Sequence, residues 1–363
     1  MSPPTSQAEW QIIERLLPSG WQEQAREQGA FRRARYIQSP SELLRLLLLH
    51  AANDGGLRQT VTQARLSGLA EMSMVGLFKR LRSSGAWLTW IARELCRQLR
   101  EEVRVPEGLR LRIFDSSTIQ GPASRGTGWR LHYSLDLQTL ACDWYEITDA
   151  QGGELLERAP VEAGDVVLAD RNYLRPRGVR TIRQAQGHVL IRMRWRHPAL
   201  QNAQGQKVRA LDWVSSLKVG QVGEWQAWLR DPEGVPIKGR VVAVKLPAPL
   251  GRRAEQKALR RAAKEHKTVD PRSLLASHYV MVFTTLPARR LKAPAVLELY
   301  RFRWQIELAF KRLKQILQLG QVPHKDPLAA QSWISAKLVI AFLLEALYRN
   351  AKALSPWGYR LEI

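Results

Sequence analysis

The sequence has few cysteines, no zinc-type histidine pattern and few acidic residues for its size. Only Cys96 and Cys142 occur, far apart in the chain, so a disulfide scaffold is excluded. The seven histidines form no HxxxH or HxxH pair, which argues against a zinc site. A catalytic metal in this chain is therefore expected to be held by oxygen ligands.

Long hydrophobic runs are also missing. The two most apolar windows, Leu43–Ala52 and Trp333–Tyr348, are short and are interrupted by Arg45, Lys337 and Glu345. A membrane helix needs a run of about 18 apolar residues, so we expect neither window to span a bilayer. The chain also begins without a positive head followed by an apolar stretch, the mark of a secretory signal. These absences predict a cytoplasmic protein with no membrane partner.

Acidic residues are too few to balance the basic ones. The 363 residues include 56 Lys and Arg against 33 Asp and Glu, which gives a formal net charge of +23. Such an excess attracts a polyanion, so DNA or RNA is the first partner to consider. From Arg171 to Arg196 there are eight arginines and no acid, a density that solubility alone does not require.

Residues 1–105 read as an all-helical N-terminal domain, and DNA binding is one function it allows. Within it, Thr62–Gly85 has two readings: a DNA-binding helix-turn-helix, or two helices of a small bundle with a basic solvent face. The sequence shows no fixed glycine turn that would decide between them. Apolar spacing typical of helices occurs in four segments, Trp10–Leu17, Leu43–Leu49, Leu69–Leu81 and Trp87–Leu99.

Strand patterns follow this domain. LRLRIFDSST alternates, with apolar residues inward and Arg110 and Arg112 outward, and we expect this strand to end at Asp115. Two β-rich runs then predict a hairpin, and VVLAD is a short apolar strand that ends on Asp170. A helix over Arg175–Gln186 and a further strand, HVLIRMRWR, complete the series.

Three strands, then strand, helix, strand and later a helix, is the order of a ribonuclease H-like α/β catalytic domain. In that order the first and fourth strands are neighbours, which predicts that Asp115 and Asp170 come together. We assign this domain to residues 106–195 and 291–320. The fold class expected is therefore α/β, preceded by the helical domain.

Between the two parts of the catalytic domain the chain changes character. Residues 196–290 are predicted to be a β-rich insertion subdomain around a very basic helix, Arg252–Lys267, and residues 321–363 a C-terminal helix and tail. Four runs read as strands of the insertion, KVRALDWV, EWQAWLRD, GRVVAVKL and HYVMVFTTL.

The stretch Leu299–Leu317 carries a single carboxylate, Glu307, among cations on one side of a predicted helix. An ordinary amphipathic helix would pair Glu307 with Arg303 and Lys311 one turn away. The alternative reading is a metal ligand beside a phosphate backbone. On a helical wheel, two sets separate. A wedge of roughly 80°, expected to face outward, holds Tyr300, Arg303, Glu307, Lys311 and Lys314. The opposite side, expected to pack on a core, holds Phe302, Ile306, Ala309, Leu313 and Ile316.

The spacing Tyr-x2-Arg-x3-Glu-x6-Lys, formed by Tyr300, Arg303, Glu307 and Lys314, resembles the signature of the DDE transposases of insertion-sequence family four. That group includes hairpin-forming cut-and-paste enzymes. FDSST and LADRNYL resemble the two aspartate motifs of the same family, and HYSLD resembles the stretch between them. The resemblance covers residues from about 109 to 340.

Two departures from the family pattern lie next to the aspartates. Ser116 stands where glycine is commoner, and Asn172 stands where a small residue is commoner. Neither changes an acid. The chain also has no long C-terminal dimerisation region of the kind some relatives carry, so its mode of dimerisation stays open.

Asp115, Asp170 and Glu307 are the catalytic and metal-binding residues that this reading implies. Three converging carboxylates suit two Mg²⁺ ions, with Mn²⁺ as a substitute, and in-line phosphoryl transfer. By resemblance, DNA phosphates are positioned by Tyr300, Arg303, Lys314 and Arg171, and we add the basic residues Lys311, Arg192 and Arg194. The remaining acids Asp136, Asp143, Asp149 and Asp165 are assigned to turns or caps.

The function expected is that of a transposase that cuts an insertion sequence from double-stranded DNA and joins it to a target. We expect a homodimer in a synaptic complex, in the cytoplasm of a prokaryote and associated with the nucleoid. Two alternatives stay open: a catalytically inactive repressor that binds the same DNA ends, and a ribonuclease H-like nuclease without strand transfer.

Overall fold

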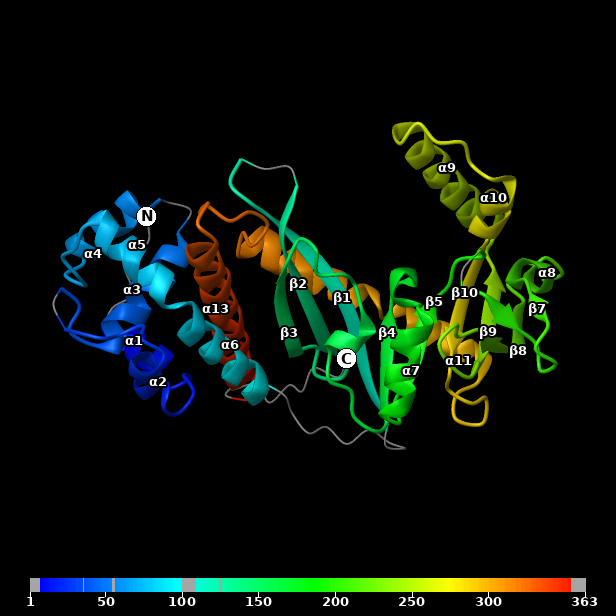
Figure 1. The fold of residues 1–363 in the computed structure, drawn as a ribbon, viewed down its shortest axis with the longest axis horizontal. Coiled ribbons are helices and arrows are strands. Elements are labelled where there is room, and N and C mark those ends of the chain that lie inside the picture. The colour runs from blue at the N-terminus through cyan, green and yellow to red at the C-terminus, as the bar shows by residue number, and fades with distance from the viewer. Residues whose placement is uncertain are drawn as a thin grey trace.

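The computed structural model describes residues 7–34, 36–53, 56–99, 109–123, 126–196 and 198–353. The domain boundary predicted near residue 105 and the C-terminal tail lie outside these ranges. A helical region occupies one end of the molecule, and a long twisted sheet extends away from it (Figure 1).

The described residues before 100 form helices only. Local sequence sets their starts: Pro40 opens α3, and the Ser39 side chain accepts a hydrogen bond from the Glu42 amide at 3.1 Å. Ser73 caps α5 in the same way, at 3.1 Å from the Gly76 amide. The six helices are α1 (Gln7–Glu14), α2 (Trp21–Glu27), α3 (Pro40–Ala52), α4 (Leu57–Leu66), α5 (Met74–Ser83) and α6 (Gly85–Leu99).

The connection between α4 and α5 contains the glycine turn that the sequence pattern did not reveal. Gly68 has a φ of 67°, in the left-handed region that glycine adopts without strain. The amides of Leu69 and Ala70 both bond back to the carbonyl of Ala64, which ends α4. The segment is thus two helices joined by the seven residues 67–73, which begin with this turn.

The long helix α13 (Pro327–Ala353) packs on the N-terminal helices α6, α3 and α5. By length and composition it is apolar enough to cross a bilayer, but 67% of its most apolar window is buried inside the protein. The buried residues include Ile334, Leu338 and Phe342, and the side chain of Lys337 is also buried. Burial in the core of the protein therefore explains the apolar composition of α13.

The described chain after residue 109 contains a ten-stranded sheet, in the order β3-β2-β1-β4-β5-β10-β9-β8-β6-β7. β1 pairs antiparallel with β2 and parallel with β4, and β4 pairs parallel with β5. This confirms that the first and fourth strands are neighbours. The strands are β1 (Arg110–Gln120), β2 (Thr127–Asp136), β3 (Cys142–Asp149), β4 (Asp165–Ala169), β5 (His188–Arg192), β6 (Leu200–Gln201), β7 (Lys207–Val208), β8 (Val222–Leu229), β9 (Ile237–Lys245) and β10 (Tyr279–Thr284).

Helices cover both faces of the sheet, so the chain forms a mixed α/β fold. Adjacent strand residues alternate between two cores: Ile113 and Leu168 lie in the core shared with α11 (Ala293–Arg301) and α12 (Trp304–Lys311). Phe114 and Val167 lie in the core shared with α7 (Pro176–Gln184). Because alternate side chains point to opposite faces, the position of a strand residue decides which layer it meets.

The strands after β5 do not form a separate sheet. β10 pairs with β5 and with β9, so β6–β10 extend the sheet that carries β1 and β4. The run KVRALDWV was expected to be a strand, and this was wrong: only Lys207–Val208 is extended, and α8 (Ala210–Val214) follows. The basic helix is confirmed as α9 (Ala248–Lys264), and α10 (Pro271–Ser277) follows it.

Two further expectations were wrong in β1. The strand does not end at Asp115 but continues to Gln120, so Asp115 lies in mid-strand. Arg112 does not face solvent: its side chain is 2% exposed, because Asp143 and Asp165 neutralise it inside the protein. Its Nη1 lies 2.9 Å from Oδ2 of Asp165.

The stretch 299–317 is not one continuous helix, so the helical wheel was applied across a break. α11 ends at Arg301, α12 begins at Trp304, and a π-helical turn follows over Arg312–Ile316. Consequently Phe302 and Ile316, which were predicted to be buried, are exposed. Tyr300, predicted on the solvated side, is only 9% exposed.

Candidate functional site

Asp115 and Asp170 lie side by side at the centre of the sheet. Phe114 on β1 is in register with Ala169, the last residue of β4, and each aspartate is the next residue along its chain. Since Phe114 and Ala169 face the α7 core, side-chain alternation turns both aspartates toward the face covered by α11 and α12. The register of this parallel strand pair therefore brings the two carboxylates together.

The carboxylate of Asp115 is partly buried among charges of both signs. Its Oδ1 accepts a hydrogen bond from the Ser116 amide at 2.8 Å, and its Oδ2 lies 3.8 Å from Nη1 of Arg303. Burial raises the pKa of Asp115 to about 6, and the charges of Glu154 and Asp170 act in the same direction. The Ser116 amide and Arg303 oppose this rise.

Glu307 reaches this place through Arg303. The break after α11 puts Arg303 at the start of α12, where its Nη2 donates to Oε1 of Glu307 one turn later. The same guanidinium contacts Asp115. The pair predicted for an ordinary amphipathic helix is thus present, but its cation also binds an aspartate on the sheet. Arg303 stands between two of the three predicted acids.

Tyr300 lies in the same group. Its pKa is raised to about 12, mainly by burial and also by the charge of Asp170, and Arg303 and Arg192 oppose this rise. Its phenol is therefore a neutral group beside the acids and not part of a solvated surface. Lys314 sits in the π-helical turn, where burial lowers its pKa. The other predicted DNA contacts are exposed, and these are Lys311, Arg171, Arg192 and Arg194.

A fourth carboxylate, Glu154, belongs to this site and was missed from the sequence. Its Oε1 accepts hydrogen bonds from Oγ of Ser116 at 2.9 Å and from Arg130 at 3.0 Å. Its Oε2 accepts from the side-chain amide of Asn172 at 3.1 Å. Glu154 lies in an irregular segment between β3 and β4 and does not directly follow a strand, so no periodic pattern of the sequence marks it.

The predicted acids do not form a closed metal cage. Among the described ranges, no group of three His, Cys, Asp or Glu side chains is placed to hold a metal, and Glu307 meets Asp115 only through Arg303. The donors nevertheless suit a hard divalent cation, since all are carboxylate oxygens. The guanidinium of Arg303 is itself a cation that lies between two of these carboxylates, Asp115 and Glu307.

The four aspartates that were assigned to turns or caps have structural roles of two kinds, in turns and in buried ion pairs. Asp136 and Asp149 accept backbone amides in turns, as predicted. Asp165 also accepts a backbone amide, from Glu162 at 3.0 Å, and it pairs with Arg112 inside the protein as well. Asp143 pairs with Arg112 and Arg110, so the prediction of a turn or cap was wrong for Asp143, because it placed Arg112 in solvent.

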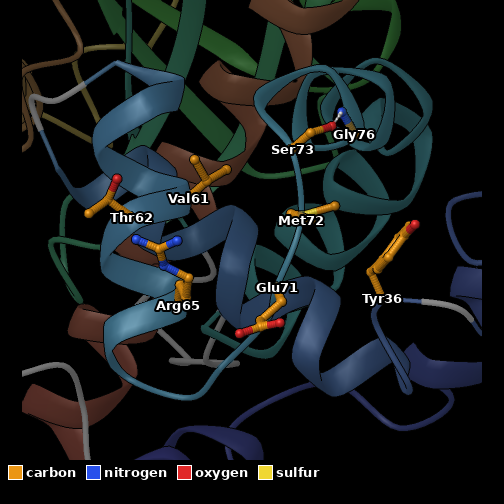
Figure 2. Close-up of a pocket in the computed structure, with 8 residues that line it drawn as sticks. All are labelled: Tyr36, Val61, Thr62, Arg65, Glu71, Met72, Ser73 and Gly76. Carbon is orange, nitrogen blue, oxygen red and sulfur yellow. Dashed lines mark hydrogen bonds between the residues drawn. The ribbon is translucent and has the colours of Figure 1, made fainter.

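A separate pocket of about 490 Å³ lies in the helical region, beside the turn that contains Gly68. Figure 2 shows Thr62 and Arg65 of α4 on one side and Met72 and Ser73 on the other. It holds one acid, Glu71. The pocket belongs to a different part of the molecule from the aspartates (Figure 1).

Comparison with known proteins decides the family. A model of the "Transposase DDE domain" matches residues 106–343, more than half of the chain. The chain belongs to the DDE transposases. It is 31% identical over 337 residues to the putative transposase InsL for insertion sequence element IS186A of Escherichia coli K12, covering 92% of this chain and 91% of that protein. The identity to the transposase for insertion sequence element IS421 of Escherichia coli is also 31%, with the same coverage.

These relatives confirm the resemblance to insertion-sequence family four and identify this DDE transposase as an enzyme of that class. The matched region runs from β1 into α13 and contains Asp115, Asp170, Glu307 and Glu154. The likeness to the two relatives extends beyond it, over most of the helical region as well.

Proposed function

We propose that this DDE transposase cuts and joins DNA by metal-dependent in-line phosphoryl transfer, with Asp115, Asp170 and Glu307 as its catalytic acids. The observation that carries the proposal is their arrangement. Asp115 and Asp170 directly follow Phe114 and Ala169, which are in register on β1 and β4, and Arg303 links Asp115 to Glu307. The strand order at this place supports a ribonuclease H-like catalytic domain.

Asp115, Asp170 and Glu307 are the residues that would hold Mg²⁺ or Mn²⁺, and two such ions would activate the attacking oxygen and stabilise the leaving oxygen. The raised pKa of Asp115 fits this use. Burial and two nearby carboxylates destabilise its charged form, which a divalent cation would stabilise. Arg303 holds Glu307 beside Asp115. With a cation held by the acids, the guanidinium of Arg303 would be free to contact a DNA phosphate.

Exposed cations around the acids supply the contact with the DNA backbone. Arg171 follows Asp170 directly, and Arg192 and Arg194 lie at the end of β5 and just beyond it. Lys311 ends α12. These charges attract phosphates without reading sequence. They suit double-stranded DNA at the element ends and at the target.

We assign recognition of the element ends to the helix-turn-helix formed by α4 and α5. The turn at Gly68 after α4 and the basic, exposed Lys79 on α5 support that reading. Arg82 is used differently, since it pairs with Asp326 at 3.2 Å. Two copies bound to two ends would form the homodimeric synaptic complex, in the cytoplasm and on the nucleoid.

The deciding experiment compares wild type with Glu307→Gln on a plasmid that carries the flanks of the gene, with Mg²⁺ present. Glu298→Gln on α11 is the matched control, since it makes the same change at an exposed position outside the group of acids. We expect wild type and the control to cut at the flank boundaries. Glu307→Gln should lose at least 10²-fold in rate while its DNA binding is unchanged.

The other outcomes separate the alternatives. Equal cutting by Glu307→Gln would refute the assignment of the third acid. Binding without cutting by wild type would favour the repressor. Cutting without any joined product in the presence of target DNA would favour a nuclease that lacks strand transfer.

A further inference from the structure

The two residues that depart from the family pattern, Ser116 and Asn172, meet at one side chain. Ser116 follows Asp115 on β1, whereas Asn172 lies two residues after Asp170, in a 3-10 turn that follows β4, so the two are distant in the sequence. Oγ of Ser116 and Nδ2 of Asn172 both donate to the carboxylate of Glu154, one to each oxygen, at 2.9 and 3.1 Å. We infer that Glu154 is a positioning residue that holds Asp115 and Asp170 at a fixed separation by bridging the chain segments that follow them.

Each aspartate is fixed to its segment by the next residue. The Ser116 amide donates to Oδ1 of Asp115 at 2.8 Å, and the Arg171 amide donates to Oδ1 of Asp170 at 2.6 Å. Ser116 therefore touches one catalytic carboxylate with its amide and Glu154 with its hydroxyl. An unbroken chain of hydrogen bonds therefore runs from Asp115 through Glu154 to the segment after Asp170.

Two arginines, Arg194 and Arg130, fix the orientation of the Asn172 and Glu154 side chains in this bridge. Arg194 donates to Oδ1 of Asn172 at 2.5 Å, which leaves the NH₂ group of that amide facing Glu154. Arg130 donates to Oε1 of Glu154 and neutralises it at 3.0 Å. Both groups of this ion pair are mostly buried, so it is stronger than a surface pair.

The local sequence brings Glu154 to this place. Asp149 accepts the amides of Gln151 and Gly152, which turns the chain sharply after β3. A side chain at Gly152 would meet Oγ1 of Thr148 at 1.9 Å, so only glycine allows the turn. Arg158 then donates to the carbonyl of Gly153 at 2.9 Å and fixes the residue before Glu154.

The inference rests on the proposed function only in treating the two aspartates as metal ligands, so its first test measures the bridge itself. In Glu154→Ala, hydrogen exchange should become faster at the amides of Arg171 and Tyr173, which both bond to Asp170. Glu157→Ala is the matched control, because Glu157 lies in the same segment and pairs with Arg177 instead. Unchanged exchange in Glu154→Ala, or an equal change in both variants, would overturn the inference.

The second test measures Mn²⁺ binding without DNA. Loss of a residue that orients metal ligands typically weakens affinity by about 10- to 100-fold, and we expect that for Glu154→Ala, with a lower kcat and little change in KM for DNA. The same substitution should have a much smaller effect in a Ser116→Gly/Asn172→Ala background, where the bridge is already lost. Equal effects in both backgrounds would show that Glu154 acts by another route.

The two proposals fail separately. If wild type binds no Mn²⁺ and cuts no DNA but Glu154→Ala still speeds exchange after Asp170, the bridge stands and the metal-dependent function does not. If wild type is active and Glu154→Ala lowers only the melting temperature, with Mn²⁺ affinity unchanged, Glu154 is structural and the inference is refuted.

Discussion

Replacing Arg112 by methionine should destabilise the protein and change the pH dependence of its stability. Nε of Arg112 lies 2.6 Å from Oδ2 of Asp143 and Nη1 lies 2.9 Å from Oδ2 of Asp165, and all three side chains are 1–2% exposed. Removing one partner of a buried ion pair costs about 3–5 kcal/mol. Arg110 remains 2.7 Å from Asp143, so we expect the lower end, about 3 kcal/mol. At about 2 °C per kcal/mol, the melting temperature at pH 7.5 should fall by about 6 °C.

The sign of the pH effect tests the cause. Burial alone would raise the pKa of Asp143, but Arg112 outweighs it and holds that pKa below its ordinary value. In wild type Asp143 therefore adds stability that is lost only as pH falls below the ordinary carboxyl range. In Arg112→Met the Asp143 carboxyl loses that cation, its pKa rises, and acidification to pH 5 should restore stability.

Differential scanning fluorimetry at pH 7.5 and pH 5 measures both effects. The triple variant Arg112→Met/Asp143→Asn/Asp165→Asn should recover part of the loss at pH 7.5, since it buries no unpaired charge. A melting temperature within 1 °C of wild type at pH 7.5, or a difference that does not shrink at pH 5, would refute the reasoning.

Two more predictions concern packing in other regions. Burial, with His324 and Lys337, lowers the pKa of His50 to about 4, so His50 contributes stability that is present above its ordinary pKa of about 6.5 and is lost as pH falls toward 4. His50→Gln should therefore show a flatter fall in melting temperature from pH 7 to 4.5, and an unchanged slope would contradict this. In Gly239→Ala the new Cβ would meet Cζ of Phe283 at 2.4 Å and the Thr284 carbonyl at 2.8 Å, so we expect a loss of about 1–3 kcal/mol in urea unfolding. Gly56→Ala, where nothing lies within 4 Å, should lose much less.

The neighbouring positions of Asp115 and Asp170 could be predicted because the succession of strands and helices matches the order of a ribonuclease H-like domain, in which the first and fourth strands are neighbours. The length of β1 could not, since polar residues such as Ser116 and Thr118 interrupt the alternation while their backbone still pairs with β2. The burial of Arg112 was hidden for a related reason: its partners come from β3 and β4, and a local pattern contains no information about a distant counterion.

Helical periodicity failed where the backbone changes direction. Tyr300 and Glu307 share a wedge only if one helix runs through both, and the chain instead breaks at Phe302 and Arg303. Glu154 could not be found at all, because an irregular segment has no period. Its role depends on hydrogen bonds to residues 38 positions earlier and 18 positions later.

The continuity of the sheet gives the molecule a fixed span. From β1, which carries Asp115, to the edge strand β7 there are seven steps between hydrogen-bonded neighbours. At about 4.8 Å a step the sheet reaches about 34 Å beyond the acids, which is close to one turn of duplex DNA. A strand added to this sheet or removed from it between β1 and β7 would change that reach by about 4.8 Å.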